Sequence, residues 1–183
     1  MLVLQAVLPG SHGLRHTLAD NLLGPGARPF SGFVAPADMQ RTTWFQSYFK
    51  NHQADLARTI ARTIRADHGG YIVELGSFLG DSAITWAAAL DQERVNATVV
   101  CIDTWTGDVP MWIHKGEMLG HPGANGQPRL YEQFLFNVQA SGYSHRILPM
   151  RASATVGLAF LEQLVTQHKL KPPPVVFLDA AHE

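Results

Sequence analysis

The chain has 183 residues, of which 46% are hydrophobic, and this indicates one globular domain with a core of its own. Fourteen Lys and Arg against fifteen Asp and Glu give a net charge of −1, which provides no overall electrostatic attraction to nucleic acid. A single cysteine, Cys101, excludes a disulfide framework, and no apolar run is long enough to span a membrane, so we expect a soluble, cytoplasmic protein.

The first 37 residues hold nine Gly or Pro and show no sustained periodicity. We expect an irregular arm there, with one short helix near Leu14–Leu23. A helical pattern begins at Asp38, and aromatic residues recur at three- and four-residue steps between positions 44 and 49. A second helix follows, with apolar residues on one face and arginines at 58, 62 and 65 on the other. That arginine face is typical of a solvated surface rather than a phosphate site.

Beyond residue 70, apolar runs alternate with helical patterns. The apolar runs predict strands at Tyr71–Leu75, Thr98–Ile102, Arg146–Met150 and Val175–Leu178. Helices are predicted between them, over Ser82–Leu90 and over the segments 131–138 and 156–165. The alternation predicts an α/β fold, with a parallel sheet covered by helices on both faces. Such a sheet also accounts for the low charged fraction of 16%.

A glycine-containing turn follows the first strand, at the end of the sheet where α/β proteins bind ligands. Gly76 is free to adopt a positive φ, and Gly80 allows a ligand to approach closely where the next helix begins. Glu74 suits an ammonium or sulfonium group, while the hydroxyls of Ser77 and Ser82 and the helix amides suit a carboxylate. A tight turn with close packing explains the two glycines equally well.

The next two strands end in residues that suit a nucleoside. Asp103 can accept both hydrogen bonds of a ribose diol, or it can serve as a turn or cap residue. Trp105 either faces an adenine or covers the edge of the sheet, and the pattern does not separate these alternatives. Small residues around Ser153 leave room for a flat base, and Ser153 is equally suited to cap the following helix.

The fourth strand ends in Asp179, and His182 follows three residues later. Histidine is a common general base near neutral pH, so we expect His182 to act as a base and Asp179 to hold a cation or an ammonium group. The alternative for His182 is an exposed residue at the start of a helix. The long loop 104–128 is rich in Gly and Pro; we expect it to shape the substrate pocket rather than to bind metal through His114 and His121.

Together these segments resemble the class I S-adenosylmethionine-dependent methyltransferases. The resemblance is carried by VELGSFLGDSAI (Val73–Ile84), CIDTWTGD (Cys101–Asp108) and VVFLDAAHE (Val175–Glu183). With LYEQFLFNVQASGY (Leu130–Tyr143) before the last of them, the order is similar to that of the small-molecule subgroup related to macrolide and cephalosporin biosynthetic O-methyltransferases. The resemblance covers about residues 40–183. It implies methyl transfer from S-adenosylmethionine to a hydroxyl or amine of a small molecule.

The resemblance also implies a role for each matching residue. Around the methionine part of the cofactor it places Glu74, Gly76, Ser77, Gly80 and Ser82. Around the adenine it places Thr104, Trp105 and Ser153. Asp103 would bind the ribose, and Asp179 would lie close to the methyl group, where some relatives also hold a divalent metal such as Mg²⁺. His182 would be the base.

The sheet of that family has seven strands in the order 3-2-1-4-5-7-6, and this chain supplies the first four. The resemblance therefore implies a Rossmann-like, doubly wound sheet of order 3-2-1-4 without its C-terminal strands. Residues 1–37 would form the N-terminal arm, and residues 38–183 the cofactor-binding half of the domain. We expect that Glu183 marks a cut, that the isolated chain is weakly active or inactive, and that the exposed apolar fourth strand favours association of copies.

Two other functions stay open at this point. The first is a Rossmann-like nucleotide-binding domain without methyltransferase activity, for instance one that binds NAD. The G-x-x-x-G spacing and the acid at Glu74 speak against a dinucleotide. The second is a non-catalytic binding domain with a decayed site.

Overall fold

A computed structural model describes residues 11–41, 52–66, 70–114, 126 and 128–179. Four strands of this part of the chain form one sheet in the order β3-β2-β1-β4, and every pair of neighbours is parallel. The elements are α1 (Ser11–Leu23), α3 (His52–Ala66), β1 (Gly70–Leu75), α4 (Asp81–Gln92), β2 (Ala97–Asp103), α5 (Val109–His114), α6 (Leu130–Ala140), β3 (Ile147–Arg151), α7 (Ala154–Thr166) and β4 (Val176–Leu178). The predicted α/β class, the parallel sheet and the strand order are confirmed.

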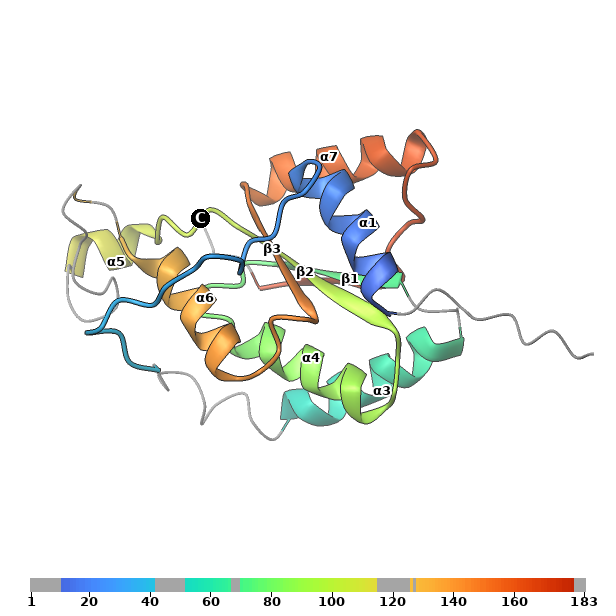
Figure 1. The fold of residues 1–183 in the computed structure, drawn as a ribbon, viewed down its shortest axis with the longest axis horizontal. Coiled ribbons are helices and arrows are strands. Elements are labelled where there is room, and N and C mark those ends of the chain that lie inside the picture. Colours follow the sequence, from blue (N-terminus) through green and yellow to red (C-terminus); the bar gives the residue numbers. More distant parts are fainter. Residues whose placement is uncertain (1–10, 42–51, 67–69, 115–125, 127, 180–183) are drawn as a thin grey trace, which may run out of the picture.

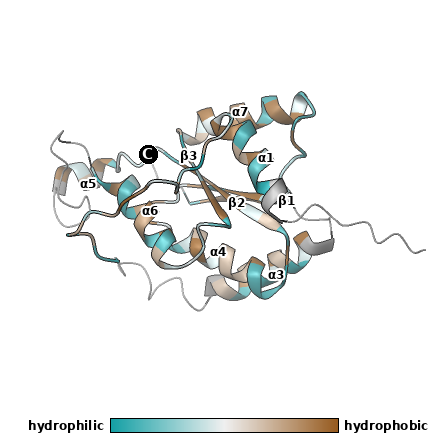
Figure 2. Ribbon diagram, viewed as in Figure 1, coloured by the Kyte–Doolittle hydropathy of each residue, from teal (hydrophilic) through white to brown (hydrophobic). Residues whose placement is uncertain are grey.

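Helices cover both faces of the sheet, which makes it a doubly wound, Rossmann-like sheet (Figure 1). On one face, α1 and α7 pack against alternate strand residues such as Val73 and Leu148. On the other face, α3, α4 and α6 pack against the residues between them, such as Ile72 and Ile147. The strands are accordingly among the most hydrophobic segments in Figure 2. None of the described helices is both long enough and apolar enough to cross a lipid bilayer.

The N-terminal helix α1 belongs to the packed body of the protein. It is longer than the predicted helix, and its residues Leu18, Ala19 and Leu22 are buried against the sheet. Arg15 ties it to the start of β3, because its guanidinium donates to the backbone carbonyls of Ser144 at 2.7 Å and Ile147 at 3.1 Å. The chain forms turns but no helix between residues 24 and 41, while the aromatic segment 44–49 lies outside the described residues. The domain boundary at residue 38 stays a prediction.

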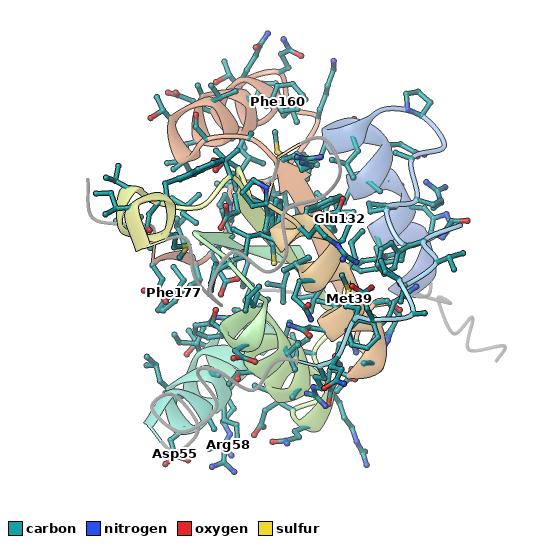
Figure 3. All side chains as sticks on the ribbon, turned by 90° about the vertical axis from the view of Figure 1, so that its left-hand side faces the viewer. Met39, Asp55, Arg58, Glu132, Phe160 and Phe177 are labelled. Atoms are coloured by element: carbon teal, nitrogen blue, oxygen red, sulfur yellow. The ribbon has the colours of Figure 1, made fainter. Side chains whose placement is uncertain are left out.

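Two of the three arginines on the predicted arginine face of α3, Arg58 and Arg62, lie at a solvated surface as predicted, and the side chain of Arg65 lies outside the described residues. Arg58 forms an ion pair with Asp55 of the same helix, and Figure 3 shows both on the side of α3 that points away from the sheet. Arg62 pairs with Glu93, which follows α4, at 2.9 Å. These side chains are already matched to carboxylates at the surface, so they offer no phosphate site.

The fourth strand is short and lies at the edge of the sheet. Val176 and Leu178 pair in register with Val73 and Leu75 of β1, yet their side chains are 48% and 69% exposed. Phe177, labelled in Figure 3, lies on the other face, edge-to-face with Trp86 of α4 at a centroid distance of 5.4 Å. The exposed apolar edge expected from the sequence is confirmed. Association of copies through that edge stays a prediction.

Gly157 marks the closest approach of α7 to the sheet. A Cβ on this residue would lie 2.6 Å from Cγ2 and 2.9 Å from Cδ1 of Ile102 in β2. In an ordinary helix interior, changing Gly to Ala stabilises a protein by roughly 0.5–1 kcal/mol. Here we expect Gly157→Ala to lower the free energy of unfolding by about 1–3 kcal/mol, because α7 must move away from β2.

Urea unfolding measures this loss, and Gly157→Ala with Ile102→Ala is the matched double variant. Because the added methyl group then fills the space left by the isoleucine, the double variant should lose less than the sum of the single losses. A Gly157→Ala protein that is more stable than the wild type would show that α7 and β2 are not in close contact.

Candidate functional site

The carboxyl ends of the four strands open into one cavity of about 550 Å³. This volume lies within the range of about 300–1,000 Å³ that is usual for small-molecule and cofactor sites. Figure 3 views the molecule from this end of the sheet. The cavity is lined by Gly76, Ser77, Phe78, Leu79, Asp81, Ser82, Ile102, Asp103, Thr104, Thr106, Gly107, Asp108, Met111, Leu130, Ala152, Ser153, Ala154, Thr155 and Asp179.

The charged side chains that line this cavity are all acidic. They are Asp81, Asp103, Asp108 and Asp179, and no Lys, Arg or His is found among the described lining residues. A concave surface with this charge attracts a ligand that carries a positive group. The same surface disfavours a pyrophosphate, whose binding usually depends on basic side chains or backbone amides.

The two glycines of the first turn have different tasks. Gly76 lines the cavity and has a φ of +84°. Its N–H donates to the carbonyl of Ile102 at 2.9 Å and so joins the end of β1 to β2. Gly80 has a φ of +90° and immediately precedes α4. A Cβ there would lie 3.1 Å from Cδ2 of Phe134 in α6. The close approach predicted at Gly80 is therefore to Phe134 and not to a ligand, since Gly80 is buried outside the cavity lining.

The first turn of α4 faces the cavity. Gly80 brings no side chain that could cap the helix amides, and Asp81 and Ser82 of the first turn line the cavity directly. Ser77 is only 2% exposed, and its hydroxyl oxygen has no hydrogen-bond partner among the described residues. The serines predicted for the site are thus brought together at the end of β1.

Glu74 lies behind the cavity wall and is fully buried. Its Oε2 accepts a hydrogen bond from the Cys101 thiol of β2 at 3.6 Å, whereas Oε1 has no partner at hydrogen-bond geometry among the described residues. Burial raises the pKa of Glu74 to about 7; the nearby hydroxyls of Ser77 and Ser82 and the thiol oppose this rise, and the charge of Asp179 adds to it. Such a carboxyl is suited to respond to a positive charge placed in the cavity.

Asp103 ties together the turns that follow β1 and β2. Its Oδ2 accepts a hydrogen bond from the backbone N–H of Phe78 at 2.9 Å, and its Oδ1 accepts one from the N–H of Trp105 at 2.7 Å. The carboxylate is therefore fixed at the wall of the cavity. Because a carboxylate has about four acceptor positions, it can still accept hydrogen bonds from two hydroxyls of a ligand.

The structure does not bring Trp105 to the cavity. The side chain is 2% exposed and packs against Tyr131 and Phe134 of α6, with both ring centroids at 4.9 Å. Its indole N–H donates to the carbonyl of Phe78 at 2.7 Å. Of the two roles that the sequence left open, covering the edge of the sheet is the one observed, and the role of flanking an adenine does not fit this burial.

Thr104 and Ser153 both line the cavity as expected. The Thr104 hydroxyl lies 2.8 Å from that of Thr106, in the turn that leads to α5. Ser153 is the N-cap of α7, and its hydroxyl accepts a hydrogen bond from the N–H of Val156 at 3.3 Å. The capping role of Ser153 is therefore confirmed. Its place in the cavity lining is also compatible with the alternative role, a position next to the base of the ligand.

Asp179 reaches the same cavity from the end of β4. Its backbone N–H donates to the carbonyl of Leu75 at 2.9 Å, which continues the pairing of β4 with β1. His182, the expected base, lies outside the described residues. In the part of the chain that the structure describes, no three His, Cys, Asp or Glu side chains are grouped as metal ligands, so the described residues do not by themselves form a site for the metal suggested at Asp179.

The loop after β2 contributes lining residues that the sequence did not single out. Thr106, Gly107, Asp108 and Met111 line the cavity, and the last of these belongs to the short helix α5. Asp108 begins this helix, because its side chain accepts a hydrogen bond from the N–H of Met111 at 2.8 Å. An aspartate just before Val-Pro is a recognisable N-cap signal that could have predicted α5. His121 lies outside the described residues, and so does the side chain of His114.

No protein-family model matches this chain, and no curated protein matches it. Among solved structures, the chain is similar to a cofactor-bound protein from MTB, Rv0187. The two are 16% identical, the match covers 94% of this chain and 62% of that chain, and the TM-score is 0.43. This chain thus spans about three fifths of the length of the solved structure that it matches. Similarity of this extent assigns no role to any residue of this chain.

Proposed function

We propose that this chain is the cofactor-binding half of an S-adenosylmethionine-dependent methyltransferase that acts on a hydroxyl or amine of a small molecule. The proposal is supported above all by the acidic cavity at the carboxyl ends of the strands, which combines Asp103 with a lining free of basic side chains among the described residues. A nucleoside with positively charged sulfonium and ammonium groups and no phosphate fits a cavity of this size and is attracted by its acidic lining.

The competing dinucleotide site is disfavoured by the same observations. A pyrophosphate would lie at the start of α4, close to the carboxylates of Asp81 and Asp103 and with no cationic side chain from the described lining. Such a pairing of like charges raises the cost of binding rather than lowering it. A Rossmann-like nucleotide-binding domain without methyltransferase activity stays the alternative, and the absence of methyl transfer would distinguish it from our proposal.

Different residues of the described cavity would bind different parts of the cofactor. Asp103 would accept the ribose hydroxyls, while Ser77, Ser82 and the first amides of α4 would hold the carboxylate of the methionine part. Glu74 would stabilise the positive charge from behind the wall. When bound, S-adenosylmethionine supplies an electrophilic methyl group on its sulfonium. The chain would hold the acceptor oxygen or nitrogen in line with that group, and His182 would take the acceptor proton.

Isothermal titration calorimetry with S-adenosylhomocysteine and with NAD tests the proposal. We expect the chain to bind S-adenosylhomocysteine and to show no binding of NAD at the same concentrations. Adenosine serves as a further ligand, because it retains the ribose and adenine but lacks the charged groups, and it should bind more weakly. Binding of NAD without binding of S-adenosylhomocysteine would overturn the proposal.

Methyl transfer itself needs a separate test, because this chain spans only part of the solved structure that it matches. In a longer protein that includes these residues, Asp179→Ala and His182→Ala should reduce transfer to the acceptor while S-adenosylhomocysteine still binds. If both variants keep full transfer, neither residue takes part in the chemistry.

A further inference from the structure

Two bulky residues beside the cavity have a backbone conformation that such residues rarely adopt. Phe78 has a φ of +42° and Trp105 a φ of +52°, in the turns that follow the adjacent strands β1 and β2. For a bulky side chain this left-handed conformation costs of the order of 1–3 kcal/mol, so it persists only where surrounding contacts enforce it. The contacts of Phe78 and Trp105 therefore show which groups hold these two turns in place.

Three hydrogen bonds close a ring around these two residues. The Asp103 carboxylate accepts the backbone N–H groups of Phe78 and Trp105, at 2.9 Å and 2.7 Å. The indole N–H of Trp105 then donates to the carbonyl of Phe78 at 2.7 Å. We call Phe78, Asp103 and Trp105 the strand-end clasp. It joins the turn after β1 to the turn after β2 by contacts that the parallel ladder itself does not provide.

The position of the indole is set by its packing against α6. Its ring is buried against Tyr131 and Phe134 of α6, so the N–H cannot swing to another acceptor without opening the core. A peptide unit is planar, and its C=O and N–H point in opposite directions. Because the Phe78 carbonyl points at the indole N–H, the N–H of Leu79 in the same peptide unit points away from the indole, in a turn that lines the cavity.

We propose that Trp105 is a positioning residue for the nucleoside site. It touches no ligand; through its indole N–H it fixes the turn of Ser77, Phe78 and Leu79, and with that turn the orientation of the Asp103 carboxylate. This inference rests on the proposed function, because the ligand whose affinity depends on the turn is the nucleoside cofactor. It assigns to Trp105 a role different from stacking on the adenine.

The test compares two tryptophan-to-phenylalanine variants. Trp105→Phe keeps a ring against α6 but removes the N–H that holds Phe78. Trp86→Phe makes the same chemical change at another buried tryptophan, which packs on Phe177 and lies outside the clasp. We expect Trp105→Phe to weaken S-adenosylhomocysteine binding about tenfold, as expected for the loss of one hydrogen bond. Trp86→Phe should leave the dissociation constant within twofold.

A ligand-free measurement separates this inference from the proposed function. In ¹⁵N–¹H NMR spectra recorded well below the unfolding midpoints, the amide signals of residues 77–80 should shift in Trp105→Phe and stay in place in Trp86→Phe. Shifted signals with unchanged affinity, or equal losses of affinity in both variants, would overturn the positioning role. If the wild-type protein binds no S-adenosylhomocysteine, the proposed function fails, and the role of Trp105 in a nucleoside site fails with it.

Discussion

Replacing Asp103 with asparagine is expected to weaken binding of S-adenosylhomocysteine about a hundredfold. The carboxylate accepts two backbone N–H groups and, in our proposal, two ribose hydroxyls as well. The asparagine amide has only one oxygen. Its NH₂ group must therefore face a donor from which the second carboxylate oxygen accepted a hydrogen bond. Hydrogen bonds to a charged group contribute about 1.5–3 kcal/mol each, and the loss of even one or two from the ligand accounts for the expected factor.

The same substitution should also lower the free energy of unfolding by about 2 kcal/mol, because one buried backbone N–H is left without an acceptor. Calorimetry gives the dissociation constant and urea unfolding gives the stability. Asp55→Asn is the matched control, since Asp55 is exposed on α3 and pairs only with surface groups. If Asp103→Asn binds S-adenosylhomocysteine within threefold of the wild type, then Asp103 does not contact the ligand.

Replacing Glu74 with glutamine is expected to stabilise the protein at pH 8 and to change little at pH 5. Burial raises the pKa of Glu74 from 4.5 to about 7 in the folded protein. Between these two values the folded state keeps the proton and the unfolded state has lost it, so raising the pH favours unfolding. At about 1.4 kcal/mol per pKa unit, the wild type loses roughly 3 kcal/mol across this window, and the loss is complete above pH 7.

Urea unfolding of both proteins at pH 5 and pH 8 measures this difference. The gain of Glu74→Gln over the wild type should grow with pH, whereas Glu162→Gln, at an exposed position of α7, controls for the loss of a surface carboxyl. The other titratable groups that face Glu74 are the Cys101 thiol, whose pKa is raised by burial, and the Asp179 carboxyl. Parallel stability curves for the wild type and Glu74→Gln would show that Glu74 does not carry the shifted titration.

Ligand binding should show the opposite pH dependence. The ammonium group of S-adenosylhomocysteine in the cavity would favour the ionised form of Glu74, so binding by the wild type should strengthen as pH rises towards about 7 and level off above it. Glu74→Gln should lack this part of the dependence and bind more weakly at pH 8. Glu74 would then be a residue that reduces the stability of the empty protein and increases the affinity for its ligand.

The sheet could be predicted from the sequence because buried parallel strands consist of nearly continuous apolar residues. Thr98–Ile102 was predicted where β2 covers Ala97–Asp103, and Arg146–Met150 where β3 covers Ile147–Arg151. Errors of one residue at strand ends are expected, since the end of pairing depends on the neighbouring strand. α5 was missed because six residues are too few to show a helical period.

The site could be predicted only in part. Parallel strands bring their carboxyl ends together, so the topology alone placed Ser77, Asp103 and Asp179 at one end of the sheet. The direction of Trp105 could not be predicted, because a positive φ in a bulky residue contradicts local preference and arises from contacts with α6. The depth of Glu74 could have been anticipated: in a strand covered on both faces, the residue between Val73 and Leu75 must be buried as well.

The strand order has a consequence for how the chain folds. Each of the first two crossovers joins strands that are neighbours in both sequence and space, so β1, β2 and β3 can assemble progressively as the chain extends. β4 instead returns across about a hundred residues to pair with β1, and Tyr71 reinforces this long-range closure by donating its hydroxyl to the carbonyl of Lys171 at 2.8 Å. Closing a loop of this length costs conformational entropy, and only a few hydrogen bonds between β4 and β1 offset that cost. We therefore expect β4 to pair after the other three strands, so that the cavity is completed when Asp179 reaches the sheet.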